Sequence, residues 1–220
     1  MQAEHSTFTA FSFLTYNHQP YTSEEYHKTV TLDNGHPSLA DFDLPLPAIE
    51  EFRIGISIDP RNLNQRLVIP IHNHNDTLVG YAGYASPEAQ RRGEPRYQYL
   101  GAATRELLNV RSALQRIQRH PIHLVTDPIT LLHLWRKLFP IVSFVGDTIC
   151  DTQVLRLQHL FPGATIMLLT DETIEGKEQR SHLLERLSRY NPVLAPRLLS
   201  PGRQISSLLP DELEQLSNLL

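Results

Sequence analysis

The sequence contains a single cysteine, Cys150, among its 220 residues, and this scarcity excludes several classes of protein. One cysteine cannot form an internal disulfide framework or a cysteine-rich zinc site, so we expect a reducing compartment. The chain also lacks an apolar run long enough to span a membrane. Its N-terminus lacks the basic and apolar regions of a secretory signal. We therefore expect a cytoplasmic protein with no membrane partner.

A strong charge of either sign is missing as well. The net charge is −4, with 40% hydrophobic and 20% charged residues, which are ordinary values for a globular protein. The whole-chain balance therefore does not indicate a partner. No phosphate-binding loop of the Gly-x-x-x-x-Gly-Lys type occurs, which argues against a nucleotide hydrolase of that class.

The pattern of hydrophobic residues changes near residue 104. Before it, the sequence predicts strands at 7–16, 28–32, 52–58, 66–71, 78–84 and 96–100, a connector at 41–47 and a polar loop at 87–95. After it, helices at 105–119, 128–138, 152–160 and 175–190 alternate with strands at 122–125, 141–145, 165–169 and an edge segment at 193–199. This alternation predicts parallel βαβ units. We expect an α/β fold (α+β overall), with a β-rich lobe at 1–104 and an α/β lobe at 105–220 whose sheet is mainly parallel.

Carboxylates gather directly after the strand predicted at 165–169. Asp171, Glu172 and Glu175 follow it and precede an amphipathic stretch of helical period. Open α/β sheets place ligands at the carboxyl ends of their strands. Two-metal phosphoryl transfer needs several carboxylates close together, since hard cations prefer charged oxygen ligands. The segment therefore has the form of a metal-binding loop with some of its ligands missing.

From about residue 49 onward, a series of short motifs follows in order. They are Glu50–Gly55 (EEFRIG), Arg66–Ile71 (RLVIPI), Leu78–Tyr81 (LVGY), Pro95–Tyr97 (PRY), Glu106–Asn109 (ELLN), Val145–Gly146, Gln153 with Leu157, Pro201–Gln204 (PGRQ) and Asp211–Leu213. In this order they resemble the RNA polymerase core of bacterial DnaG-type primases and their plasmid and phage relatives. In that family a β-rich subdomain precedes a Toprim domain, the metal-binding α/β fold shared with topoisomerases. The resemblance implies the same arrangement here.

Threonines stand at several positions where the family carries catalytic carboxylates. By the resemblance, Thr126 replaces the glutamate that ends the first Toprim strand, and Thr130 replaces the helix-borne aspartate that follows. In the Asp-x-Asp motif, Asp171 survives and Thr173 replaces the second aspartate. A hydroxyl cannot carry the charge that holds magnesium, and the loss of several anionic ligands should abolish phosphoryl transfer. The resemblance therefore implies a degenerate member with no catalytic residue, no expected cofactor and no zinc-binding domain.

A displaced metal site is the alternative. Asp127, Asp147, Asp171 and Glu172 are all expected at one sheet edge, where they could bind Mg²⁺ or Mn²⁺. Acidic residues at such positions also cap helices, and Asp127 before Pro128 has the form of an N-cap with proline at the first helical position. The sequence leaves both interpretations open.

Arginines are concentrated between residues 91 and 119, with Tyr97 and Tyr99 among them. Arginine contacts to phosphates, with aromatic stacking, hold single-stranded nucleic acid without reading its sequence. The candidate contacts are Arg66, Arg91, Arg92, Arg96, Arg105 and Arg111. A solvated helix face whose arginines point in several directions is the competing interpretation.

We predict a non-catalytic primase-like protein that binds single-stranded nucleic acid or a replication protein. Two other functions stay open. One is a metal-dependent nucleotidyl transferase or nuclease that uses the displaced carboxylates, and the other is a module that binds only protein.

Overall fold

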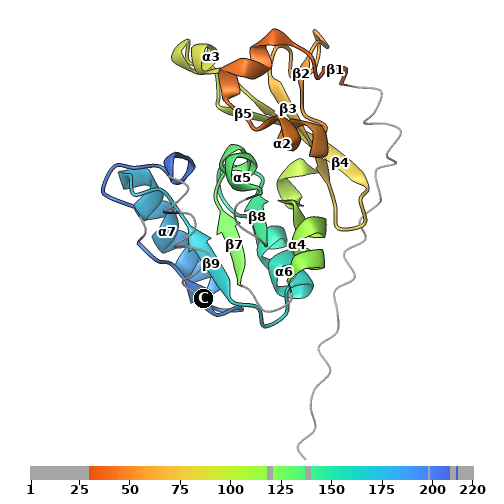
Figure 1. Ribbon diagram of the computed structural model, residues 1–220. Coiled ribbons are helices and arrows are strands. Elements are labelled where there is room, and N and C mark those ends of the chain that lie inside the picture. The colour runs from red at the N-terminus through yellow and green to blue at the C-terminus, as the bar shows by residue number, and fades with distance from the viewer. Residues whose placement is uncertain (1–29, 118–120, 137–139, 198, 209–211, 213–220) are drawn as a thin grey trace, which may run out of the picture.

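The protein is represented by a computed structural model that describes residues 30–117, 121–136, 140–197, 199–208 and 212. Two sheets follow one another along the chain, and Figure 1 shows the first above the second. The first is antiparallel and the second mostly parallel. This confirms the predicted fold class.

The first sheet has five strands in the order β1-β2-β3-β4-β5. Its strands and the short helices around it are β1 (Leu32–Asp33), η1 (Pro37–Phe42), α2 (Leu46–Glu51), β2 (Gly55–Ser57), β3 (Leu67–His72), β4 (Leu78–Tyr84), α3 (Pro87–Arg91) and β5 (Tyr97–Gly101). The last of these strands ends just before the predicted boundary at residue 104.

The second sheet has the order β10-β9-β7-β8-β6. Its elements are η2 (Ala103–Arg105), β6 (Leu107–Leu108), α4 (Val110–Arg116), β7 (Ile122–Val125), α5 (Pro128–Leu134), β8 (Ile141–Phe144), α6 (Asp151–Leu160), β9 (Ile166–Leu169), α7 (Ile174–Leu187), β10 (Val193–Leu194) and η3 (Ile205–Ser207). Only β6 runs antiparallel to its neighbour within this sheet.

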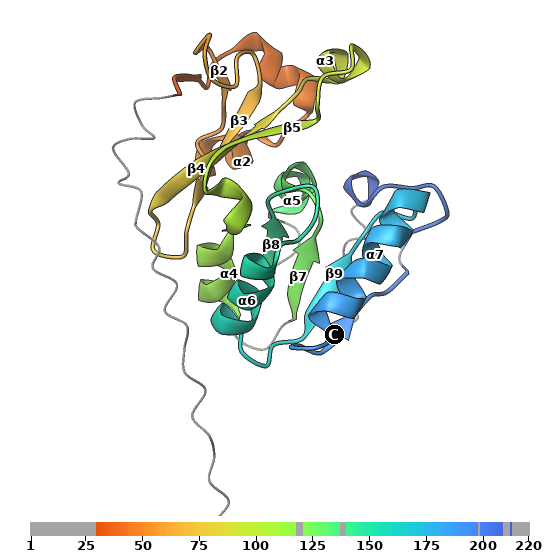
Figure 2. The same ribbon diagram turned by 180° about the vertical axis from the view of Figure 1, so that it is seen from behind.

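Alternate residues of the central strands point into two different cores. Leu124 of β7 and Leu168 of β9 contribute to a cluster with apolar residues of α4, α6 and α7. Val125 and Leu169, the next residues along, belong to another cluster with α5 and the first lobe. Because side chains alternate along a strand, α4, α6 and α7 cover one face and α5 with the first lobe covers the other. Figures 1 and 2 show α5 between the two sheets.

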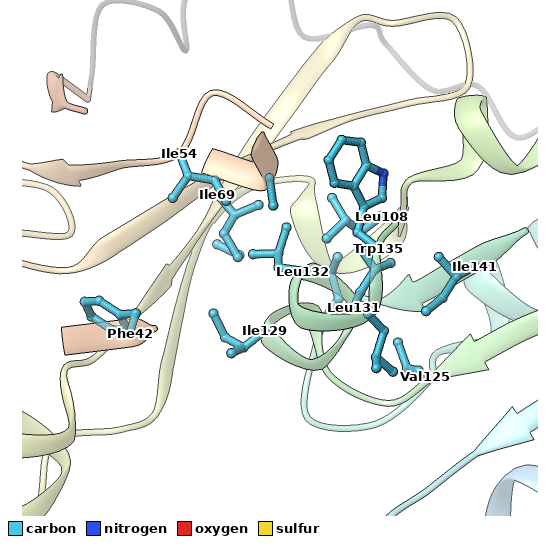
Figure 3. Packing of buried hydrophobic residues seen from close by; sticks show 14 of the residues in the cluster. Phe42, Ile54, Ile69, Leu108, Val125, Ile129, Leu131, Leu132, Trp135 and Ile141 are labelled. Carbon is cyan, nitrogen blue, oxygen red and sulfur yellow. The ribbon is translucent and has the colours of Figure 1, made fainter. Parts of the chain in front are cut away.

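One hydrophobic core joins the two lobes. Ile54 and Ile69 of the first lobe pack in the same cluster as Leu132 and Trp135 of the second, as Figure 3 shows. Phe52 contacts Trp135 edge to face, with ring centroids 5.4 Å apart. The hydrophobic effect therefore stabilises the docking of the lobes as well as each lobe.

Several predicted segments differ from the structure. The connector predicted at 41–47 contains part of η1 and the start of α2, and the loop predicted at 87–95 contains α3. The helix predicted at 105–119 begins only at Val110, because β6 precedes it and joins the sheet. The strand predicted at 7–16 lies outside the described residues. Within the part of the chain that the structure describes, no helix is long and apolar enough to cross a bilayer.

Candidate functional site

The carboxyl ends of three neighbouring strands carry the predicted acidic residues. Asp127 follows β7, Asp147 follows β8, and Asp171 follows β9. β7 pairs in parallel with β8 on one side and with β9 on the other. The three carboxylates therefore belong to one edge of the sheet, with Asp127 in the middle, at the position where open α/β sheets bind ligands.

Asp127 has several partners within the protein. Its carboxylate forms an ion pair with Arg96 and accepts a hydrogen bond from the hydroxyl of Tyr97. It also accepts a hydrogen bond of 2.8 Å from the amide of Ile129, which makes it the N-cap of α5. Burial, and then the charge of Asp127, raise the pKa of Tyr97, so its hydroxyl stays a hydrogen-bond donor at neutral pH. Asp127 thus links the second lobe to the start of β5.

Asp171 lies on the same cavity as Asp127, in a half-buried position. Its carboxylate accepts a 2.7 Å hydrogen bond from the amide of Ile205, which belongs to the C-terminal segment. Burial raises the pKa of Asp171, the Ile205 hydrogen bond opposes that shift, and the charge of Asp127 adds to it. The two carboxylates are therefore close enough to repel each other.

Asp147 is exposed at the end of β8. Burial, followed by the charges of Asp147 and Asp127, raises the pKa of Tyr99. Tyr99 on β5 is therefore within electrostatic reach of both carboxylates. Asp147 lines a different cavity, together with residues of α7 such as Glu175 and His182.

Glu172 is buried and turned into the protein. It forms an ion pair with Arg180 of α7, which also donates a 2.7 Å hydrogen bond from Nε to the hydroxyl of Thr170. A buried carboxylate in such a pair is held by its partner, since separating the charges would leave one of them uncompensated. Glu172 therefore connects the loop after β9 to Arg180 of α7.

The threonines that were predicted to replace carboxylates cap a helix, line the cavity or follow a strand. Thr173 is the N-cap of α7, and its hydroxyl accepts a 3.0 Å hydrogen bond from the amide of Gly176. Thr130 of α5 lines the cavity with Asp127 and Asp171. Thr126 is the residue that follows β7. None of these side chains supplies negative charge to the edge.

Two of the four carboxylates predicted for a displaced metal site are paired with arginines. Magnesium needs several anionic or carbonyl oxygens that converge on one point. Here the carboxylate of Asp127 forms an ion pair with Arg96, and that of Glu172 forms one with Arg180. Among the residues that the structure describes, no group of three or more His, Cys, Asp and Glu side chains is placed to hold a metal ion.

The predicted nucleic-acid contacts fall into two groups. Arg91, Arg92 and Arg96 lie at or after α3, and Arg105 and Arg111 lie in or near α4. Figures 1 and 2 show α3 at one end of the first lobe and α4 below the β3–β4 hairpin at the other. The structure therefore does not bring the six arginines together on one patch.

Several of these arginines have carboxylate partners. Arg92 pairs with Glu88 and Glu94, and Arg111 pairs with Asp76 at the hairpin tip. Pairs this exposed are weak, so they leave the guanidinium groups available to a stronger acceptor.

Arg66 is different, because only 5% of its side chain is exposed. It pairs with Glu94 and donates a 2.9 Å hydrogen bond to the carbonyl of Pro95. Its observed role is to order the loop before β5, and the phosphate contact predicted for it remains a prediction.

The sequence placed Tyr97 and Tyr99 among the arginines, but it did not identify Tyr84 as a member of the aromatic cluster around Arg96. Its guanidinium carbon lies 5.4 Å from the ring centroid of Tyr84 and 5.7 Å from that of Tyr97, in cation–π contacts. The rings of Tyr97 and Tyr99 stack with centroids 5.7 Å apart. The alternation of tyrosines along β5 was a possible signal, but the position of Tyr84 on β4 depends on strand pairing.

Comparisons with known proteins agree with this geometry at the level of the fold. No protein-family model matches the chain, and no curated protein matches it. Among solved structures, the Aquifex aeolicus primase, with zinc-binding and RNA polymerase domains, aligns with a TM-score of 0.69 at 14% identity, over 90% of this chain and 58% of that one. The RNA polymerase domain of Mycobacterium tuberculosis primase DnaG aligns with a TM-score of 0.65 at 14% identity, over 88% and 79%.

A third similar structure is a DnaG primase catalytic domain bound to single-stranded DNA. It aligns with a TM-score of 0.63 at 15% identity, covering 89% of this chain and 74% of that chain. At these identities the likeness concerns the fold. The chain therefore has a fold that resembles the catalytic core of DnaG primases, including its Toprim part.

Proposed function

We propose that this protein is a non-catalytic counterpart of primase catalytic cores that binds single-stranded nucleic acid. The observation that carries the proposal concerns Asp127, at the sheet edge where a metal would be needed. Its carboxylate pairs with Arg96 and accepts a hydrogen bond from Tyr97. The threonines at positions 126, 130 and 173 support it, because they supply no charge for a dication. The DNA-bound primase of the same fold supports the choice of ligand.

The proposed phosphate contacts are the exposed arginines at the end of α3 and in the region of α4, without Arg96. Arg91 and Arg92 offer cations at the end of α3, and Arg105 and Arg111 offer them beside α4. Since the two groups lie at opposite ends of the first lobe, a strand that reaches both must run across it. Binding of this kind depends on charge and is therefore sensitive to salt.

Anisotropy of a labelled single-stranded DNA, measured across a salt series, tests this function. We expect binding at low salt that weakens as salt rises. For Arg91→Gln with Arg92→Gln, the slope of log K against log salt should fall by roughly 1.4 if both residues contact phosphates. Arg189→Gln, which changes an exposed arginine in the turn after α7, is the matched control and should leave the slope unchanged. No binding at low salt would exclude the nucleic-acid ligand and favour a protein partner.

A metal-dependent transferase or nuclease is the second candidate. The observation that favours it is the meeting of Asp127, Asp147 and Asp171 at one sheet edge. It requires manganese- or magnesium-dependent turnover that is lost in Asp171→Ala. Calorimetric titration with Mn²⁺ distinguishes the two candidates, because the proposed function predicts no saturable heat of binding.

A further inference from the structure

Arg96 is held more firmly than the arginines proposed as phosphate contacts. Its guanidinium pairs with Asp127 across the two lobes and packs against the rings of Tyr84 and Tyr97. Even so, 53% of its side chain is exposed. The group is therefore fixed in direction and can still be reached from solvent.

The cavity beside Arg96 carries an excess of negative charge. It has a volume of about 340 Å³, and its charged and titratable lining residues are Asp41, Asp127, Asp171, Arg96 and His133. A phosphate that enters this cavity therefore meets three aspartates against one arginine and one histidine. Repulsion between like charges therefore disfavours the binding of a phosphate in this cavity.

Carboxylate and phosphate are competing acceptors for the same guanidinium. Both offer paired oxygens that match the planar fork of arginine. Asp127 has the advantage of being part of the protein, where α5 and Tyr97 hold it in position. A phosphate that binds Arg96 must therefore displace Asp127, which loses almost no entropy by remaining paired.

We infer that Asp127 is an internal competitor for nucleic-acid phosphate, which keeps Arg96 out of the binding surface. The inference rests on the proposed function, because it names which of the arginines bind. In the wild-type protein the arginines of α3 and of the α4 region contact phosphates, and Arg96 does not. Neutralising Asp127 releases Arg96 and removes one of the repelling charges.

Asp127→Asn is the direct test, measured as the Kd for labelled single-stranded DNA at low salt. Asparagine keeps the size and the N-cap of α5 while removing the charge. We expect binding at least about tenfold tighter. The released Arg96 guanidinium can form a charge-assisted hydrogen bond with a phosphate, and such a bond is stronger than one between neutral groups. Asp147→Asn removes the same charge from the same edge without releasing Arg96, and we expect it to change Kd by less than about twofold. Equal gains in the two variants would overturn the inference.

Arg96→Gln completes the cycle. It should leave the wild-type Kd nearly unchanged and should abolish the gain of Asp127→Asn when the two are combined. Arg96→Gln could instead weaken binding as much in the wild-type protein as in Asp127→Asn. That result would show that Arg96 already contacts the strand, which contradicts the inference. Asp127→Ser, also a good N-cap without charge, serves if the asparagine variant does not fold.

The outcomes for the two proposals are separable. If the wild-type protein does not bind but Asp127→Asn binds through Arg96, the proposed function fails and the competition by Asp127 stands. If the wild-type protein binds and Asp127→Asn does not bind more tightly, the proposed function stands and the competition is refuted. If neither protein binds, both proposals are refuted.

Discussion

At the scale of single residues, the carboxylates of this edge are distinguished by their partners. Asp127 and Glu172 are each paired with an arginine, whereas Asp171 accepts an amide hydrogen bond next to a second carboxylate. Carboxylates at the same sheet edge therefore have two different electrostatic environments. These environments decide which carboxylates remain available for chemistry.

Asp171 should make stability depend on pH. Because burial raises its pKa in the folded state above the ordinary value of 3.8, the ionised form destabilises the native protein at neutral pH. As the pH falls through the raised pKa, the native state takes up the proton before the unfolded state does, so this cost disappears.

We therefore expect Asp171→Asn to raise the Tm at pH 7, since the amide oxygen can still accept the Ile205 hydrogen bond. The gain should shrink as the pH falls toward 3.8 and below. Thermal melts of wild type and variant across this pH range measure the difference. Exposed Asp147→Asn is the control and should show a smaller pH-dependent difference. A gain that is constant with pH would contradict the assignment.

At the scale of elements, close backbone contact sets the start of α7. A Cβ atom added at Gly176 would lie 2.3 Å from the carbonyl oxygen of Asp171 and 2.9 Å from its Cβ atom. The helix can begin against this loop only because position 176 has no side chain. The glycine thus positions Asp171 as well as the helix.

Gly176→Ala should consequently lower the free energy of unfolding. Helix propensity alone favours alanine by about 1 kcal/mol, but overpacking of a tight contact costs about 1–3 kcal/mol. We expect the clash to prevail, with a net loss on the order of 1 kcal/mol. Urea unfolding measures it, and Ser181→Ala on the exposed side of the same helix provides the reference. An increase in stability would show that the loop relaxes without cost.

The sequence predicted best those elements that a short local pattern of residues specifies. The strands β7, β8 and β9 are short apolar runs, and they were predicted within about a residue of their observed ends. The short helices α2 and α3 were predicted as connector and loop, because their prolines were interpreted as breaks. Proline is tolerated in the first helical turn, and Ser86-Pro87 is an N-cap followed by such a proline.

At the scale of the whole molecule, the two lobes share a core and should unfold together. Trp135 is the single tryptophan, is 5% exposed, and packs against Phe52 of the other lobe. Its fluorescence therefore reports directly on the docking of the lobes. Far-ultraviolet circular dichroism reports on both sheets at once.

We expect the two signals to follow a single transition in the wild-type protein. Phe52→Ala should destabilise by about 2–4 kcal/mol, somewhat less than the roughly 3–5 kcal/mol for a core phenylalanine, because Phe52 is only half-buried. It should also shift the Trp135 emission to longer wavelength, whereas Phe52→Leu should cost less. A fluorescence transition that precedes the dichroism transition would show that the lobes separate before they unfold.

The amino-acid sequence by itself determined the fold class, the order of the two lobes and the residues available at the strand ends. These properties follow from local hydrophobic period and from residue identity. Only the tertiary structure decided what those residues do. Arg96 and Asp127 are 31 positions apart and come from different lobes, so their pairing depends on how the lobes dock. Docking is a collective result of many buried contacts, and short motifs do not specify it.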